Sequence, residues 1–312
     1  MILKEASNTE NHARPWWFTN SARTAFEALL RGVVWKEGTS LLMPAYIGFT
    51  EREGSGVFDP VRKTGTPYTF YPLGERLEID LGSMGAMLAT GKHPMLLVIH
   101  YFGLAHVDMG KLRELCHAHG TLLVEDCAHV PGPVGHTTDL GTYGDAAIYS
   151  LHKVLPMPDG GVLRLNNPKL PRPVLKEGEG GPASTLEQVL RADMAAIAAD
   201  RIRNYVYLLE KLRDVDGLEI LYPSLGGQVP HNFPIRVKDG LREKLYFALM
   251  EDGMPTIALY YRMIQELPAV SYPLSHALAT DILNLPVHQD TTLADLEALC
   301  GAIKSKLEVL RT

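Results

Sequence analysis

Two short apolar segments of the sequence end in side chains that can do chemistry together. Segment 122–124 is followed by Glu125-Asp126, and segment 146–149 is followed by Ser150-Leu151-His152-Lys153. Both segments are typical of buried strands, and in an open α/β sheet the carboxyl ends of the strands form the edge where ligands bind. We therefore expect the carboxylate of Asp126 and the amine of Lys153 to meet at that edge, although an acidic pair after a strand is also common as a turn or a helix cap.

An aspartate and a lysine placed in this way suit pyridoxal phosphate (PLP). The lysine amine forms a Schiff base with the aldehyde of the cofactor, and the aspartate holds the pyridine nitrogen protonated. The protonated ring draws off the electrons left when the substrate Cα–H bond breaks, and the freed lysine then moves the proton. The residues thus predict PLP as the cofactor, with Asp126 and Lys153 as catalytic groups.

The phosphate of such a cofactor needs hydrogen-bond donors, and the segment Ser21-Ala22-Arg23-Thr24 offers them. It opens a predicted helix, where unpaired backbone N–H groups and the helix dipole favour an anion. An ordinary serine N-cap is the alternative interpretation of the same residues. The segment alone does not decide between the two.

Hydrophobic patterning predicts the elements that carry these groups. The first 167 residues read as α/β with a largely parallel sheet, residues 168–184 as a linker or exposed loop, and the last third as a smaller α+β domain; residues 51–76 stay unassigned. We expect strands at 41–43, 95–100, 121–124, 146–149, 162–165, 233–237 and 282–287, and helices at 21–34, 108–119, 186–212, 241–252 and 293–310.

Composition excludes several classes of protein. Of the 312 residues, 46% are hydrophobic and 21% are charged, as in ordinary globular chains, and the net charge of −6 gives no general attraction to nucleic acid or anionic lipid. The three cysteines show no short metal-binding or disulfide spacing, so we expect reduced thiols and no structural zinc. The acidic start does not resemble a secretory signal and no apolar run is long enough to cross a membrane, which favours a cytoplasmic protein.

Taken together, the motifs resemble those of the DegT/DnrJ-type (sugar aminotransferase) family of fold-type I PLP-dependent enzymes. The resemblance runs in order across most of the chain. The matching segments are Ser21-Ala22-Arg23-Thr24-Ala25, Met43-Pro44-Ala45-Tyr46, His100-Tyr101-Phe102-Gly103, Glu125-Asp126-Cys127-Ala128-His129, Gly144-Asp145-Ala146, Ser150 to Lys153, Gly160-Gly161 and Leu285-Pro286-Val287-His288.

The resemblance implies a role for each matching position. Lys153 is similar to the Schiff-base lysine of the family, and Asp126 to the partner of the pyridine nitrogen. His129 stands where the family has Gln or His, near the phenolic oxygen of the cofactor. The phosphate-binding positions correspond to Ser150 and to Ala22 and Arg23 at the helix start.

Three further positions leave alternatives open. Either Tyr46 or Phe49 matches the aromatic ring that lies over the cofactor face. His100 matches a pocket position, but a histidine satisfied within the core is an equally serious interpretation. The sequence Trp16-Trp17-Phe18 could belong to a subunit interface or to ordinary core packing.

The chain departs from the family in two places. In the family, the lysine usually lies further along the chain from the serine than Lys153 does from Ser150, which predicts a shortened loop here. Sugar dehydratases of the family carry histidine in place of the lysine, so His152 could also be aligned with that position. We favour Lys153. Residues 170–190 also lack the usual Gly-x-Asn-Tyr-Arg segment, whose asparagine reaches the phosphate of the neighbouring subunit. This puts that contact and the pocket for a nucleotide-sugar in question.

From the resemblance we expect a large PLP-binding α/β domain over residues 1–180 and a smaller α+β domain over 181–312. The implied function is amino transfer, with glutamate as the small-molecule donor and a keto-sugar nucleotide or related keto compound as acceptor, in a homodimer. The alternatives are a PLP-dependent sugar dehydratase and a catalytically silent PLP-binding or regulatory homologue.

Overall fold

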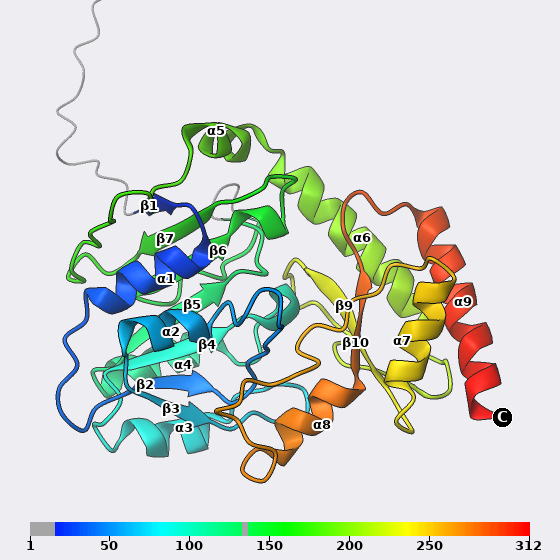
Figure 1. The fold of residues 1–312 in the computed structure, drawn as a ribbon, viewed down its shortest axis with the longest axis horizontal. Helices are drawn as coiled ribbons and strands as arrows, with labels where there is room; N and C mark the ends of the chain where they lie inside the picture. The colour runs from blue at the N-terminus through cyan, green and yellow to red at the C-terminus, as the bar shows by residue number, and fades with distance from the viewer. Residues whose placement is uncertain (1–15, 133–136) are drawn as a thin grey trace, which may run out of the picture.

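The computed structural model describes residues 16–132 and 137–312. Figure 1 shows a larger α/β part and, beside it, a small sheet flanked by long helices. The elements are β1 (Trp16–Thr19), α1 (Ala22–Arg31), β2 (Leu41–Pro44), α2 (Phe58–Thr64), β3 (Tyr68–Tyr71), α3 (Leu81–Leu88), β4 (Met95–Ile99), η2 (Tyr101–Gly103), α4 (Met109–Ala118), β5 (Leu122–Cys127), β6 (Ala146–Ser150), η3 (Leu151–Lys153), β7 (Gly161–Leu165), α5 (Ala183–Arg191), α6 (Met194–Leu212), β8 (Leu218–Ile220), β9 (Asn232–Val237), α7 (Arg242–Glu251), α8 (Pro273–Asp281), β10 (Ile282–Pro286) and α9 (Leu293–Arg311), where η marks a 3₁₀ turn.

The central sheet is mixed but mainly parallel. Its strand order is β1-β7-β6-β5-β4-β2-β3. The strands from β6 to β3 pair in parallel, whereas β7 runs antiparallel to both β6 and β1. All five residues of β4 are buried, as expected for a strand covered on both faces, which explains why the sequence shows a continuous apolar run there. The predicted α/β fold with a largely parallel sheet is confirmed.

Two hydrophobic cores divide the described residues. The first surrounds the central sheet, and the second packs the antiparallel sheet β10-β9-β8 against α6, α7 and α9. Met194, at the start of α6, belongs to the first core, whereas Tyr205, later in the same helix, belongs to the second. The predicted domain division at residue 180 stays a prediction.

The long helix predicted at 186–212 is wrong. The structure has two helices, α5 and α6, separated at Ala192, whose backbone is extended. Asp193 then caps α6 by accepting a hydrogen bond from the N–H of Ala196. Periodicity cannot detect this break because the apolar spacing continues through it, while the aspartate offers the backbone a new start.

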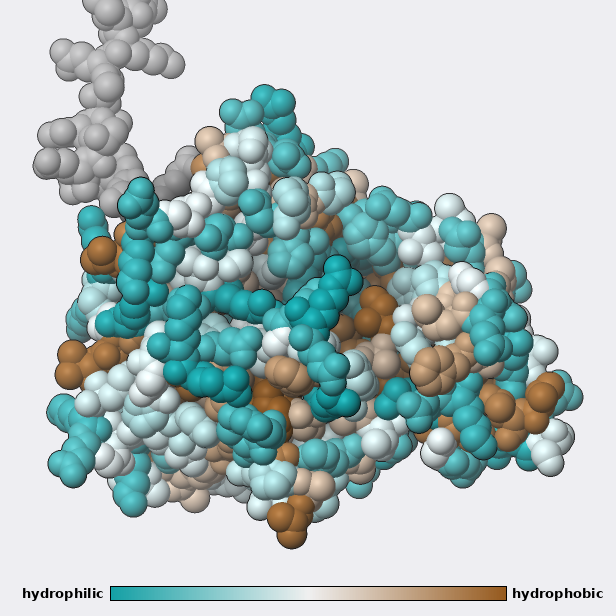
Figure 2. Space-filling view, viewed as in Figure 1, coloured by the Kyte–Doolittle hydropathy of each residue, from teal (hydrophilic) through white to brown (hydrophobic). Residues whose placement is uncertain are grey.

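The surface shows small hydrophobic patches among hydrophilic residues on the face in Figure 2. The segment 16–18, whose place was left open, lies half-buried in the edge strand β1, and its part in a subunit interface stays a prediction. Among the described residues, no helix combines the length and apolar character needed to cross a membrane.

Candidate active site

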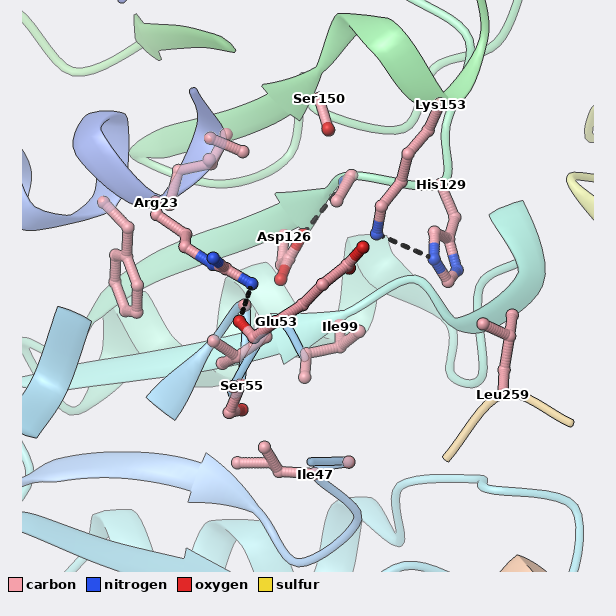
Figure 3. A pocket seen from close by; sticks show the side chains of 18 of the residues that line it. Arg23, Ile47, Glu53, Ser55, Ile99, Asp126, His129, Ser150, Lys153 and Leu259 are labelled. Atoms are coloured by element: carbon pink, nitrogen blue, oxygen red, sulfur yellow. Dashed lines mark hydrogen bonds between the residues drawn. The ribbon is translucent and has the colours of Figure 1, made fainter. Parts of the chain in front are cut away.

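A cavity of about 410 Å³ lies at the carboxyl ends of the parallel strands. Ile99 ends β4, Asp126 is the penultimate residue of β5, and Ser150 ends β6. Figure 3 shows these side chains around one space, together with groups from α1 and from the C-terminal half of the chain. The lining comprises residues 21–23, 26, 47–50, 53–57, 99, 100, 126, 128, 129, 148, 150, 152, 153, 259 and 260.

The carboxylate of Asp126 is buried and accepts few hydrogen bonds from the described residues. The strand registers place it between Ile99 of β4 and Ile148 of β6. It is 9% exposed, and its Oδ1 accepts a hydrogen bond of 2.9 Å from the N–H of Ala128. Burial raises its pKa, against the lowering effects of that N–H and of the Lys153 charge. Such a group is stabilised by a cationic N–H placed in the cavity.

The amine of Lys153 is held by His129. The two atoms, Lys153 Nζ and His129 Nε2, are 3.1 Å apart. The other ring nitrogen, Nδ1, accepts a hydrogen bond of 3.3 Å from the N–H of Phe102. Because a neutral imidazole has one N–H, this assigns the proton to Nε2, which donates to the lone pair of an uncharged lysine.

The charges and burial around this pair favour the same protonation state. Burial lowers the pKa of Lys153, partly opposed by the carboxylate of Asp126. Burial and the Lys153 charge hold the pKa of His129 well below its usual range. A free amine at neutral pH is the form that attacks an aldehyde.

A single 3₁₀ turn, η3, brings Lys153 to the cavity. It follows directly from β6, and its first N–H, of Leu151, donates to Gly160 O at 2.9 Å. This is the short connection expected from the close spacing of Ser150 and Lys153. The neighbouring His152 also lines the cavity but is mainly exposed, whereas Lys153 reaches His129. Lys153 thus contacts His129, whereas His152 lies 3.5 Å from Ser150 Oγ, and the choice of Lys153 over His152 stays a prediction.

The opposite end of the cavity carries the donors expected for a phosphate. Ser21 is the N-cap of α1 and accepts a hydrogen bond from the N–H of Thr24, while Ala22 and Arg23 line the cavity; phosphate binding at this helix start stays a prediction. The start of α1 packs closely on β7, because a Cβ on Gly161 would lie 2.2 Å from the carbonyl carbon of Ser21. Only glycine permits this approach.

Arg23 is held by a loop that sequence analysis left unassigned. Its Nη2 donates to the carbonyl oxygen of Glu53 at 2.5 Å. Backbone hydrogen bonds between Thr50 and Gly54 close this loop as a tight hairpin. The side chain of Glu53 extends into the cavity toward Lys153 (Figure 3). No motif pointed to Glu53, because its place depends on the hairpin and on Arg23.

Replacing Arg23 with glutamine is expected to weaken PLP binding about tenfold while leaving Lys153 reactive. The substitution removes a charge-assisted contact to the phosphate and keeps a side chain of similar length. Equilibrium dialysis of the purified variant with PLP measures the effect, with the exposed Arg52→Gln in the same region as control. An affinity equal to that of the wild type would remove Arg23 from the phosphate site.

Of the two candidate aromatic residues, Phe49 lines the cavity and Tyr46 does not. Tyr46 is fully buried beside Tyr101 and Tyr260, with ring centroids 5.5 and 5.2 Å away. Tyr260 itself lines the cavity and was missed by sequence analysis. A Cβ on Gly48 would lie 2.8 Å from the Tyr260 ring, so the glycine makes room for it, and only the tertiary structure brings the two together.

His100 lines the cavity but is satisfied by Glu125. Its Nε2 lies 2.8 Å from Glu125 Oε2, and both side chains are fully buried. The carboxylate also accepts hydrogen bonds from the N–H groups of Gly141 and Gly144, at 2.8 and 2.6 Å. Burial alone would raise the pKa of Glu125, but the hydrogen bond and charge of His100 and the two N–H groups bring it below its usual value. The pair holds the loop after β5 in place.

Replacing Glu125 with glutamine is expected to cost about 3 kcal/mol of unfolding free energy, because it leaves buried donors without a charged acceptor. Since the folded-state pKa is lowered, the carboxylate stabilises the fold above its unfolded-state pKa. That contribution is lost as the pH falls through the folded-state value. Urea unfolding of both proteins at neutral and acidic pH measures this, and a stability difference that does not shrink at acidic pH would contradict it.

The donor set of the cavity fits PLP. One space is lined by a buried carboxylate with no ion pair among the described residues, by a lysine whose pKa burial lowers, and by a helix start with an arginine and a serine hydroxyl. These groups match, in order, the ring nitrogen, the aldehyde and the phosphate of the cofactor.

The chain is similar in sequence to GDP-perosamine synthases and in structure to DesV. GDP-perosamine synthase from Caulobacter vibrioides is 23% identical over 326 residues, covering 92% of this chain and 84% of that protein. The same enzyme from Vibrio cholerae is 30% identical over 96 residues, but the match covers only 30% of this chain and 26% of that protein. Among solved structures, DesV from S. venezuelae superposes with a TM-score of 0.74 at 20% identity, covering 93% of this chain and 84% of that chain.

The sequence profile of one family matches residues 19–176 and 183–304, which is most of the chain. The matched ranges include every predicted site residue, and the structural similarity to DesV extends over both cores. The predicted fold, that of a PLP-dependent transferase of fold type I, agrees with this similarity. The chain therefore belongs to the DegT/DnrJ/EryC1/StrS aminotransferase family.

Proposed function

We propose that this protein is a PLP-dependent aminotransferase that takes an amino group from glutamate and transfers it to a keto-sugar nucleotide or a related keto compound. The observation that carries the proposal is the position of the Lys153 amine, whose Nζ lies 3.1 Å from His129 Nε2 in the same cavity as the buried carboxylate of Asp126. The naming of relatives as GDP-perosamine synthases supports a sugar acceptor.

PLP, when bound, supplies an aldehyde that joins to amines and a ring that takes up the electron pair of a broken Cα–H bond. Asp126 would hold the proton on the ring nitrogen, since among the described residues its carboxylate accepts a single hydrogen bond, from the N–H of Ala128. Arg23 and the start of α1 hold the phosphate. His129 keeps Lys153 oriented and uncharged.

Lys153 also moves the proton of the reaction. With PLP bound, the Nζ of Lys153 would be placed to take up the proton lost from Cα of the amino donor and to give it back within the same site. Glutamate leaves as its keto acid, and the same steps in reverse aminate the keto acceptor. Enclosure by the two halves of the chain favours transfer over loss of the proton to water.

The proposed function also includes the substrates, the cellular location and the oligomeric state. The donor and the acceptor are small molecules that enter the cavity, and neither nucleic acid nor a membrane takes part. We propose a cytoplasmic homodimer, as in the family. The missing Gly-x-Asn-Tyr-Arg segment would then leave the phosphate to donors of one subunit. Residues 183–191 form α5 there instead.

The test separates three outcomes. The protein is incubated with PLP, its visible spectrum recorded, and the complex reduced with borohydride and mapped by peptide mass. A label on Lys153, followed by conversion of the bound cofactor to pyridoxamine phosphate on adding glutamate, supports amino transfer. A label without conversion by glutamate favours a dehydratase. The absence of any label overturns the proposal and leaves a catalytically silent homologue.

A further inference from the structure

Three side chains from the C-terminal half of the chain meet behind His129. Arg201 lies in α6, His231 precedes β9, and Gln289 follows β10. The backbone of His231 packs closely on Gly103, because a Cβ on Gly103 would lie 2.9 Å from the backbone N of His231. Sequence analysis singled out none of the three, and the reaction steps above do not use them.

The imidazole rings of His231 and His129 are stacked. Their centroids are 4.5 Å apart and their planes differ by 11°. The Nη1 of Arg201 lies 3.2 Å from His231 Nδ1, and its Nε donates to Gln289 Oε1 at 3.0 Å.

The same network returns to the backbone beside the lysine. The amide nitrogen of Gln289 donates to Val154 O at 3.0 Å. Val154 directly follows Lys153 in the chain. The C-terminal half thus supports Lys153 twice, once through the His129 ring and once through the neighbouring carbonyl.

The hydrogen bonds assign the protons of both rings. A guanidinium only donates, so His231 Nδ1 must accept, and an uncharged His231 carries its proton on Nε2. Phe102 N–H imposes the same state on His129. Both rings are therefore uncharged, with the proton on Nε2. A proton on Nδ1 of either ring would face an N–H donor.

The charges around the stack act in the same direction. His231 faces Arg201, Lys153 and His288, and His288 Nδ1 is 3.3 Å from Asp290. His129 faces Lys153, His231 and Arg201. Burial is the largest cause that holds the pKa of each ring well below its usual range, and repulsion from any positive charge on these neighbours adds to it. Asp126 and Glu53, the nearby acids, act on Lys153 rather than on the rings.

The burial of Arg201 lowers the stability of the fold. The Arg201 side chain is fully buried, its Nη2 meets no hydrogen-bond partner in the part of the chain that the structure describes, and burial lowers its pKa to about 10. A buried cation without an acid in contact destabilises a fold, so stability does not explain it.

We propose that Arg201 and His231 are positioning residues for Lys153. The hydrogen bond from Arg201 keeps the His231–His129 stack uncharged, and the stack holds the Nε2–H of His129 on the free amine of Lys153. The mechanistic importance of this arrangement rests on the proposed aminotransferase function, but the arrangement itself can be measured without cofactor.

The direct test is NMR of the cofactor-free protein labelled with ¹⁵N-histidine, with the His231 signals assigned from a His231→Phe variant. We expect both rings to show the uncharged state with the proton on Nε2 at pH 6.5, because burial lowers the pKa of each. Arg201→Met removes the donor to Nδ1 and the positive charge but not the burial, so His231 should take up a proton at a higher pH than in the wild type. In Arg201→Gln, whose amide can still donate to Nδ1, it should stay uncharged. A charged His231 at pH 6.5 in the wild type would overturn the proposal.

The consequence for Lys153 is tested by acetylation of the cofactor-free protein, read by peptide mass relative to the exposed Lys304. In Arg201→Met, Lys153 labelling should fall about fivefold at pH 6 and little at pH 8, because a charged His231 breaks the stack and the free amine loses its donor. The double variant Arg201→Met/His231→Phe, whose ring cannot be charged, should regain the wild-type pH profile. Arg203→Met, an exposed change on the same helix, should match the wild type throughout.

Equal profiles for Arg201→Met and the wild type would refute the positioning role. Thermal unfolding establishes that each variant is folded, and the wild-type NMR measurement decides the question if Arg201→Met is not. Because neither experiment contains PLP, these results stand apart from the test of the proposed function. A protein that fails to bind PLP would refute that function while leaving the labelling result interpretable.

Discussion

Replacing Lys153 with alanine is expected to lower the rate of amino transfer from glutamate by about 10⁴-fold, because it removes both the amine that holds the cofactor and the base that moves the proton. The fold should persist, since the side chain lies at the cavity wall and its one side-chain hydrogen bond is to His129. Single-turnover conversion of PLP to pyridoxamine phosphate by glutamate measures the loss.

Two controls make this result specific. Lys304→Ala, at an exposed position of α9, should leave the rate unchanged. Adding a small primary amine to Lys153→Ala should restore part of the rate, since a diffusible base can take the place of the missing one. A Lys153→Ala protein within tenfold of the wild type would mean that another group, such as the neighbouring His152, performs the chemistry.

Replacing Asp126 with asparagine is expected to lower the same rate by about 10³-fold. The two side chains have almost the same shape, but the amide has no charge to hold a proton on the ring nitrogen, which then accepts electrons poorly. Asp252→Asn, at an exposed site paired with Lys306, is the matched control and should have no effect on the rate.

The pH dependence of cofactor binding distinguishes this role from a structural one. In the cofactor-free protein, burial raises the pKa of Asp126, so the carboxylate takes up a proton at a higher pH than an exposed aspartate does. The affinity for PLP should therefore fall as the pH drops through that raised value, and Asp126→Asn should lack this dependence. Equal pH profiles for both proteins would contradict the assignment of Asp126 to the ring nitrogen.

Much of the large α/β part was predictable because its signals are local. Buried strands such as β4 and β5 are continuous apolar runs, and a buried strand needs no partner to be recognised in the sequence. Region 51–76, in contrast, contains α2 and β3, which were not predicted. Their apolar residues are few and lie between glycines and prolines, so no period emerges.

Some residues of the candidate site were predictable from the sequence and others were not. Asp126 and Ser150 lie at the carboxyl ends of β5 and β6, and Lys153 follows three residues after Ser150, so the register of the sheet is enough to bring them to one edge. The aromatic residue at the cavity could not be chosen in advance. Tyr46 and Phe49 are close in the chain, and only the packing of Tyr46 against Tyr101 takes it out of the cavity.

The sequence by itself determined the α/β fold, the family, and the groups at the strand ends, because each depends on residues that are neighbours in the chain or on strands whose order the fold imposes. Only the tertiary structure decided which groups surround them. Glu53 and Tyr260 reach the cavity from a hairpin and from the C-terminal half. The stack of His231 on His129 joins residues 102 positions apart (231 − 129), Arg201 contacts His231 across 30 positions, and no local pattern of charge or hydrophobicity encodes such contacts.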